Sequence, residues 1–239
     1  MLANRWSAID AFAAQQSVDA QTAIIIDLDK TLIGARGRNH HLIDTARLTA
    51  LKSAVIDVLG DDYDEGRFSE TYHCFNQPRF HRFTGDNQDF LAFICVMAGG
   101  NIVTPEALQA MFAQGMMRYF DHFVDLTEAR VNAFQSPLAP FHHQFTTLYR
   151  AGDMTPFKSF RYLEYTETAK RFGCASDAEP VTTLLNSEIV ITGELWQQAQ
   201  RWKAQGALLF GLSDKPDEAA CGPDNSKPIH RLMTHVVGE

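Results

Sequence analysis

The chain has 239 residues, of which 45% are hydrophobic and 21% charged, and its formal net charge is -8. No uninterrupted apolar run approaches the roughly 20 residues that a membrane-spanning helix needs, so we expect no membrane partner. The acidic balance also opposes nucleic-acid binding through the whole surface, because that affinity comes from clustered Lys and Arg. We therefore expect a globular protein that is long enough to bury a core.

The N-terminal stretch MLANRWSAIDAFAAQQSVDAQ is poor material for a signal peptide, because Asp10, Gln15 and Gln16 interrupt its apolar residues. We therefore expect a cytoplasmic protein. The four cysteines lie far apart and form no C-x-x-C pair, which indicates neither a disulfide framework nor a structural zinc site.

The first predicted strand is AIIIDL, residues 23–28. It is short, apolar and rich in Ile, which is typical of a parallel strand covered on both faces. Residues from about 40 to 180 are predicted to be almost wholly helical. Within them, Thr104 is a candidate N-cap for a single helix over residues 104–123, whose apolar stripe consists of Leu108, Phe112, Met116, Tyr119 and Phe123.

The C-terminal part again predicts an alternation of helix and strand. Thr192 is a candidate helix cap, Gly206 suits a helix stop, ALLFGL supplies a strand, and THVVG is a last strand-like run. A strand, a crossover helix and another strand are the parts of a parallel sheet. We expect an α/β fold with a Rossmann-like parallel sheet core and a large all-helical cap insertion, in which residues 1–34 and 181–239 form the core and 35–180 the cap.

Acidic residues stand at the end of the first strand. Asp27 and Asp29 are two positions apart on an extended segment, so they point the same way and can share one polar pocket beyond the strand. Their mutual repulsion disfavours double ionisation unless a cation lies beside them. Mg²⁺ takes oxygen ligands and keeps several waters, and it is the cofactor that this arrangement predicts.

The stretch DLDKT after an apolar strand resembles the first motif, D-x-D-x-T, of the haloacid dehalogenase superfamily. The resemblance implies a phosphohydrolase in which Asp27 is the nucleophile, Asp29 is the general acid/base and Thr31 helps to fix the turn. DKT also opens the D-K-T-G-T signature of P-type ATPases, in which the nucleophile would be Asp29. Because Leu32 and Ile33 replace the Gly-Thr of that signature, Asp27 is kept as nucleophile.

The other motifs of the superfamily have candidates in the C-terminal part. GLSDKP resembles the second motif and nominates Ser213 as the hydroxyl that binds the phosphoryl group, with Thr192 after EIVI as the alternative. The third-motif lysine is Lys227, in SKP, or else Lys215. Glu239 follows HVVG at the place where the resemblance implies a metal-binding acid, and Asp214 is a compensating carboxylate, so the predicted metal ligands are Asp27, Asp29, Glu239 and Asp214.

The cap insertion begins with a basic segment, GARGRNHH, in an otherwise acidic protein. Arg36 and Arg38, with Lys215, are candidates to bind an anionic substrate, because the guanidinium group matches phosphate through paired hydrogen bonds. The sequence thus predicts a Mg²⁺-dependent phosphatase that acts on a small phosphorylated metabolite. The alternative is a catalytically weak or inactive relative that binds a phosphorylated ligand or a protein partner.

Overall fold

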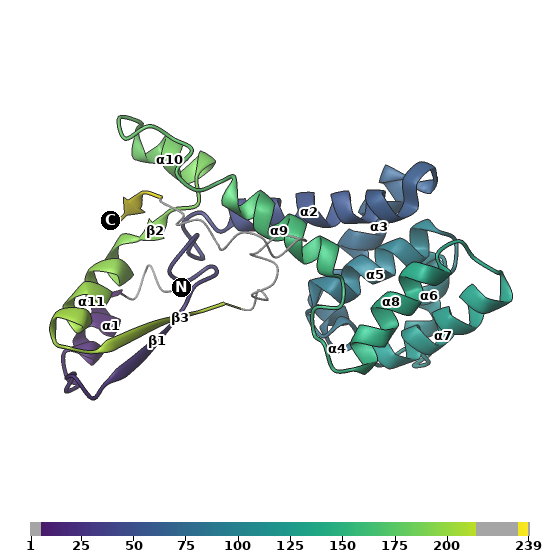
Figure 1. Ribbon diagram of the computed structural model, residues 1–239, viewed down its shortest axis with the longest axis horizontal. Helices are drawn as coiled ribbons and strands as arrows, with labels where there is room; N and C mark the ends of the chain where they lie inside the picture. The colour runs from purple at the N-terminus through teal and green to yellow at the C-terminus, as the bar shows by residue number, and fades with distance from the viewer. Residues whose placement is uncertain (1–5, 214–233, 239) are drawn as a thin grey trace. The chain divides into compact units, whose positions relative to one another are not determined.

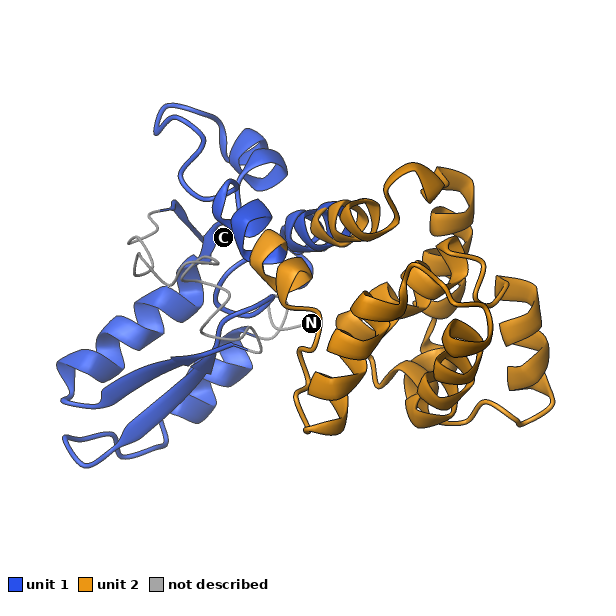
Figure 2. Ribbon diagram, turned by 45° about the vertical axis from the view of Figure 1, so that its right-hand side comes forward, with its two compact units in different colours: residues 1–49, 164–239 blue, residues 50–163 orange. Residues whose placement is uncertain are grey.

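The chain forms two compact units in a computed structural model that describes residues 6–213 and 234–238. Residues 1–49 and 164–239 make the first unit, and residues 50–163 make the second (Figure 2). The first unit contains both segments expected to form the core, and it also takes in residues 35–49 and 164–180 from the expected cap. Helices α2 (His41–Leu59) and α9 (Lys158–Ala169) each have residues in both units.

The first unit contains the predicted parallel strand pair (Figure 1). Strand β1 (Ala23–Asp27) pairs with β3 (Leu208–Leu212) so that Ala23 lies opposite Leu208 and Asp27 opposite Leu212. Helix α11 (Gly193–Ala204) precedes β3, and Gly206 ends the segment with a φ of 99°, a conformation that favours glycine. The apolar runs at residues 23–28 and 207–212 are therefore confirmed as strands.

One face of this strand pair is exposed, which the apolar sequence of β1 does not reveal. Ile25 is 68% exposed and its partner Phe210 is 53% exposed, whereas Ile26 on the other face is 9% exposed. On that other face, Ile26 and Leu209 line a groove of about 510 Å³ together with Trp196 of α11. The expectation that both faces of β1 are covered is wrong for the part of the chain that the structure describes, because helices pack against only one face of the strand.

The last strand-like run pairs elsewhere. Strand β4 (Val236–Val237) is parallel to β2 (Ile191–Thr192), with Ile191 opposite Val236. The described strands thus form two sheets of two strands each. The parallel α/β character is present, but residues 6–213 and 234–238 do not assemble a full Rossmann-like sheet. The remaining helices of the first unit are α1 (Trp6–Ala13) and α10 (Val181–Ser187).

The second unit is helical and has a core of its own. Phe93 stacks on Phe145 with ring centroids 4.1 Å apart and meets Phe123 edge-on at 5.9 Å, and all three side chains are fully buried. Aromatic pairs in these orientations stabilise a core by more than the free energy gained from burying their surface area. The helices wholly inside this unit are α3 (Glu65–Phe75), α4 (His81–Thr84), α5 (Gln88–Gly99), α6 (Pro105–Ala113), α7 (Phe120–Ala133) and α8 (Ala139–Arg150), with 3-10 turns at Gly60–Asp62 and Pro78–Phe80.

The single helix expected over residues 104–123 is two helices. Thr104 caps α6 as predicted, because its side chain accepts a hydrogen bond from the amide of Ala107 at 3.2 Å. The helix ends at Ala113, and Gly115 then takes a left-handed φ of 74°. The chain resumes as α7 at Phe120. Met116, which lies on the predicted apolar stripe, is 52% exposed, because the break takes it off any helix face.

A buried ion pair fastens the end of the second unit. The carboxylate of Asp89 is fully buried and accepts hydrogen bonds from the amide of Phe157 at 2.9 Å and from Nε of Arg161 at 2.6 Å. The side chain of Arg161 is 6% exposed. Helices α5 and α9 are therefore joined by a charge pair that is shielded from water.

Candidate active site

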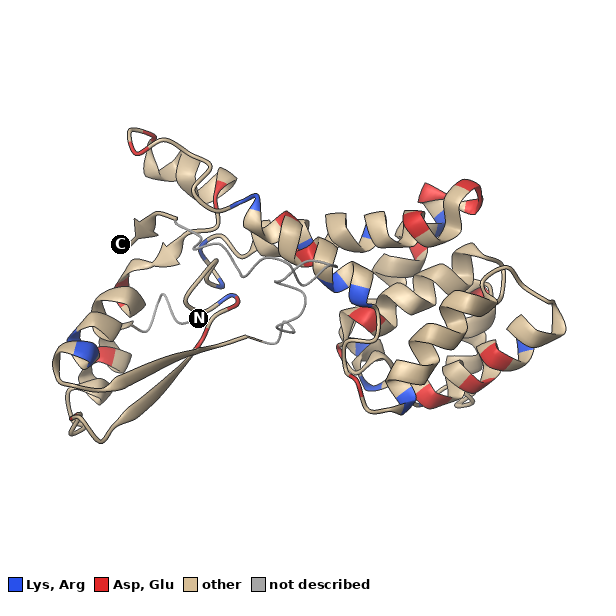
Figure 3. Cartoon of the chain, in the orientation of Figure 1, with Lys and Arg blue, Asp and Glu red and all other residues tan. Residues whose placement is uncertain are grey.

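The candidate site lies at the carboxyl ends of β1 and β3. Asp27 is the last residue of β1, and its partner Leu212 is followed directly by Ser213. The amide of Leu28 continues the ladder by donating to the carbonyl of Leu212 at 2.9 Å. Figure 3 shows no charged residue along β3, and none along β1 before its end. The parallel pairing therefore brings DLDKT and GLS side by side at one end of the strands.

Two hydroxyl groups orient the two carboxylates. Thr31 donates its hydroxyl to Oδ2 of Asp27 at 2.5 Å, and Ser213 donates to Oδ2 of Asp29 at 2.6 Å. Asp27 is exposed, whereas Asp29 and Ser213 are half-buried. One carboxylate is thus fixed by a local hydroxyl and open to solvent, while the other is held from the neighbouring strand.

The loop after β1 is tightly folded. The carbonyl of Leu28 accepts hydrogen bonds from the amides of Thr31 at 3.3 Å and Ile33 at 3.0 Å. Lys30 has a left-handed φ of 60°, a conformation that residues with a Cβ rarely adopt and that persists only where the surrounding structure stabilises it. The Lys30 carbonyl accepts a hydrogen bond from the amide of Arg36 at 3.0 Å, and its ammonium group contacts Asp44.

The two candidate arginines have different surroundings. Arg36 is exposed, and its amide donates to the carbonyl of Lys30 at 3.0 Å. No ion pair of its side chain is found among residues 6–213 and 234–238. Arg38 instead forms a two-point ion pair with Glu194, with distances of 2.7 and 2.9 Å. Among the described residues, Arg36 is thus exposed, whereas Arg38 is engaged within the protein.

Thr192 contacts the loop after β1 through its side chain. Its hydroxyl donates to the carbonyl of Thr31 at 2.9 Å, and its amide donates to the carbonyl of Leu32 at 2.7 Å. The predicted N-cap position of Thr192 at the start of α11 is confirmed, but its side chain makes no capping hydrogen bond. The hydroxyl is used to fasten β2 to the loop that follows Asp27.

Candidate metal ligands are only partly within the described chain. Asp27 and Asp29 supply hard oxygen donors, and Mg²⁺ in proteins is often held by one or two carboxylates together with substrate phosphate and water. The two residues fit that role. Within residues 6–213 and 234–238 there is no cluster of three His, Cys, Asp or Glu side chains suited to a metal ion. Four predicted site residues lie outside the described residues, namely Asp214, Lys215, Lys227 and Glu239.

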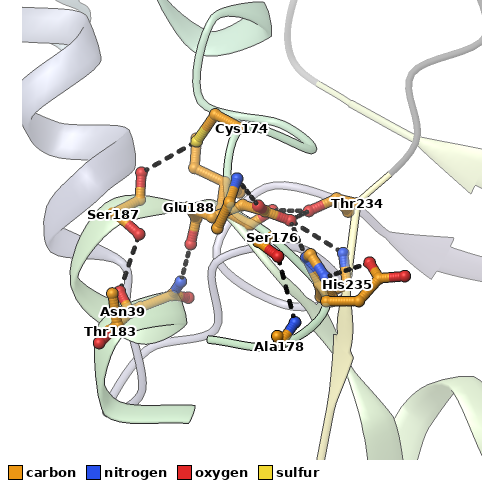
Figure 4. Close-up of polar contacts among 12 residues, drawn as sticks. Asn39, Cys174, Ser176, Ala178, Thr183, Ser187, Glu188, Thr234 and His235 are labelled. Atoms are coloured by element: carbon orange, nitrogen blue, oxygen red, sulfur yellow. Dashed lines mark hydrogen bonds and ion pairs between the residues drawn. The ribbon is translucent and has the colours of Figure 1, made fainter. Parts of the chain in front are cut away.

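A second polar cluster surrounds the fully buried carboxylate of Glu188 (Figure 4). Oε1 of Glu188 accepts from the hydroxyl of Thr234 at 2.5 Å and from the amide of His235 at 2.9 Å, and it lies 2.8 Å from Nδ1 of the same imidazole. Oε2 accepts from the amide of Ala175 at 3.0 Å. Glu188 precedes β2 and His235 precedes β4, so this cluster joins the two strands at their starts.

The sequence analysis missed this cluster. The one signal available was an acid placed directly before the apolar run IVI, at residues 189–191. Nothing local indicated that Thr234 and His235 are its partners, because they lie more than forty residues away.

We expect the attachment of β4 to weaken as the pH rises. Burial alone would raise the pKa of Glu188, but its hydrogen bonds outweigh that effect and lower the pKa to about 2. The hydrogen bond to Glu188 raises the pKa of His235, and Asp177, 3.1 Å from Nε2, acts in the same direction. The stabilisation from His235 is therefore complete below about pH 6.5 and is lost as the pH rises through the raised pKa.

This expectation is checked by denaturant titration of the chain between about pH 6 and pH 9. The free energy of unfolding of the first unit should decline over that range, and His235→Gln should flatten the decline. His41→Gln is the control, because His41 is exposed at the start of α2. A pH profile that His235→Gln leaves unchanged would show that the imidazole does not carry the effect.

Along residues 6–213 and 234–238, the search for a helix with the length and apolar character needed to cross a membrane finds none. No protein family model, curated protein or solved structure matches the chain.

Proposed function

We propose that the chain is a Mg²⁺-dependent phosphohydrolase that acts on a small phosphorylated metabolite through an aspartyl-phosphate intermediate. The observation that supports the proposal is the parallel pairing of β1 with β3, which brings Ser213 to the strand end that carries Asp27 and lets the Ser213 hydroxyl donate to Asp29 at 2.6 Å. This is the arrangement that phosphoryl transfer to a carboxylate requires: a nucleophile, a second carboxyl for the proton and a hydroxyl donor at one strand end.

In the proposed reaction, a carboxylate oxygen of Asp27 attacks phosphorus and the bond to the leaving oxygen breaks. The hydrogen bond from Thr31 holds the attacking carboxylate in one orientation. Asp29 gives its proton to the leaving oxygen, and it then takes a proton from the water that hydrolyses the aspartyl phosphate. Dividing the reaction into two displacements lowers the barrier of each.

The proposed cofactor and the other charged groups serve to balance the phosphate. Asp27 and Asp29 would hold Mg²⁺, which would supply positive charge to offset that of the phosphoryl oxygens. Arg36 is proposed to bind the anionic part of the substrate, because it is the exposed arginine of the loop. The roles of Lys227 or Lys215, and of Asp214 and Glu239 as further metal ligands, remain predictions from the sequence.

The helical residues are proposed to act as a cap. They stand in the chain between DLDKT and GLS, and the second unit has its own buried aromatic core. A cap excludes water during the reaction and contacts the part of the substrate that is not phosphate.

The direct experiment measures phosphate release from a panel of small phosphorylated metabolites with and without Mg²⁺. We expect turnover of at least one compound that depends on the metal. If no compound of the panel is turned over in a metal-dependent manner, the enzyme hypothesis is rejected. Saturable binding of a phosphorylated compound in that case would identify the chain as a binding protein.

Ser213→Ala is expected to lower kcat/KM by roughly 10²-fold, because it removes the hydroxyl that donates to Asp29 in the structure and that is proposed to turn to a phosphoryl oxygen when substrate binds. Ser213→Thr keeps the hydroxyl and should retain most of the activity. Steady-state kinetics on the best substrate of the panel compare the two variants. Equal losses in Ala and Thr variants would assign the effect to packing and would contradict a role for the hydroxyl.

A further inference from the structure

Both terminal nitrogens of the Arg38 guanidinium group donate hydrogen bonds to other parts of the protein. Nη2 donates to Oε1 of Glu194 at 2.7 Å and Nη1 donates to Oε2 at 2.9 Å, so the pair has the two-point geometry that a carboxylate offers to arginine. The side chains are only 9% and 15% exposed. A pair so shielded from water holds its geometry better than a surface ion pair.

The same guanidinium group reaches the C-terminal strand. Nη1 also donates to the carbonyl of Val237, the last residue of β4, at 2.6 Å. The start of α11 packs against the same place, because a Cβ added to Gly193 would lie 2.7 Å from the amide nitrogen of Gly238. Arg38 therefore links the start of α11, which carries Glu194, to the end of β4.

Arg38 belongs to the loop that leaves the candidate nucleophile. This loop begins after Asp27, is fastened at Thr31 by the hydroxyl of Thr192, and reaches α2 just after Arg38. The ion pair with Glu194 fixes its far end. In the sequence, Val237 and Gly238 lead directly to Glu239, the predicted fourth-motif residue. One side chain thus connects the DLDKT loop with the segment that leads to the fourth motif.

We propose that Arg38 is a positioning residue that couples the loop after Asp27 to the end of β4, and that it does not bind substrate. The inference rests on the proposed phosphatase function where it concerns catalysis. Its structural part, the fixing of β4 by the Arg38 and Glu194 pair, stands apart from any activity. Lysine cannot replace this arrangement fully, because an ammonium group lacks the planar fork that binds a carboxylate and a carbonyl together.

The kinetic test compares Arg38→Ala, Arg38→Lys and Glu194→Gln with Arg36→Ala. A positioning role predicts that Arg38→Ala and Glu194→Gln lower kcat by a similar factor, about 10-fold, and leave KM nearly unchanged. Arg38→Lys should recover part of the loss. Arg36→Ala should raise KM instead. Arg150→Ala is the matched control, since Arg150 forms a two-point pair with Glu128 in the other unit.

A readout without activity comes from hydrogen exchange measured on peptides that contain Val236 and Val237. We expect faster exchange there in both Arg38→Ala and Glu194→Gln, and wild-type exchange in Arg150→Ala. Unchanged exchange, or a rise in KM in Arg38→Ala that Glu194→Gln does not share, would overturn the proposal. If the wild type turns over no substrate while exchange at β4 still rises, the phosphatase assignment fails and the coupling by Arg38 stands.

Discussion

Asp27→Asn is expected to abolish phosphate release, with kcat lowered by roughly 10⁴-fold or more. Asn keeps the size of the side chain and can still accept the hydrogen bond from Thr31, so the loop should remain folded. What is lost is the anionic oxygen that is proposed to attack phosphorus. The measurement is single-turnover and steady-state phosphate release in the presence of Mg²⁺.

Asp29→Asn separates the two carboxylates. Because Asp29 is proposed to move protons and not to attack, its loss should cost roughly 10²- to 10⁴-fold in kcat. The nucleophile is still present, so a slowly hydrolysed phosphoryl group should accumulate on Asp27 and be detectable by mass spectrometry of the intact chain. If DKT were the operative frame, the covalent group would disappear in this variant and persist in Asp27→Asn.

Asp57→Asn is the matched control for both changes. Asp57 is exposed on α2, and the same loss of one negative charge there should leave kcat unchanged. An Asp27→Asn variant that retains the activity of Asp57→Asn would refute the assignment of Asp27 as nucleophile.

Asp89→Ala is expected to destabilise the second unit by roughly 3–5 kcal/mol. The change leaves Arg161, whose side chain is 6% exposed, without its buried carboxylate, and it removes the acceptor of the Phe157 amide. Each group loses the hydrogen bond to Asp89 that offset part of the cost of its burial. Guanidinium chloride denaturation followed by far-UV circular dichroism measures the loss.

Glu128→Ala is the comparison for that variant. Glu128 also pairs with an arginine in the second unit, but its side chain is 42% exposed, so its removal should cost about 1 kcal/mol or less. Similar losses in the two variants would mean that burial does not decide the strength of these pairs. Phosphatase activity of Asp89→Ala at low temperature should persist wherever the variant remains folded.

Local sequence patterns predicted those parts of the fold that depend on residues close together in the sequence. The apolar runs before Asp27 and before Ser213 predicted β1 and β3, and Gly206 predicted the helix end between α11 and β3. The hydrogen bond from Ser213 to Asp29 was not predicted, because Ser213 had been assigned to the phosphoryl group. The break after Ala113 was missed, because Gly115 inside an apolar stripe leaves the stripe itself intact.

Contacts between distant segments escaped the sequence analysis. The pair of Arg38 with Glu194 spans 156 positions, and the sequence alone favours interpreting a basic loop beside DLDKT as a substrate contact. The cluster of Glu188 with His235 has the same origin, since it depends on how β4 is placed along β2. The exposed face of β1 escaped for a related reason: an isoleucine run is the same whether one face or both are covered.

The division into two units makes their unfolding separable by optical means. The chain has three tryptophans, Trp6, Trp196 and Trp202, and all lie in the first unit. Indole fluorescence therefore reports on the unit that carries Asp27 and Ser213, whereas the second unit contributes helical circular dichroism and no indole signal. Melting curves that coincide in the two signals would mean that the units unfold as one cooperative body, and separated curves would measure the stability of each.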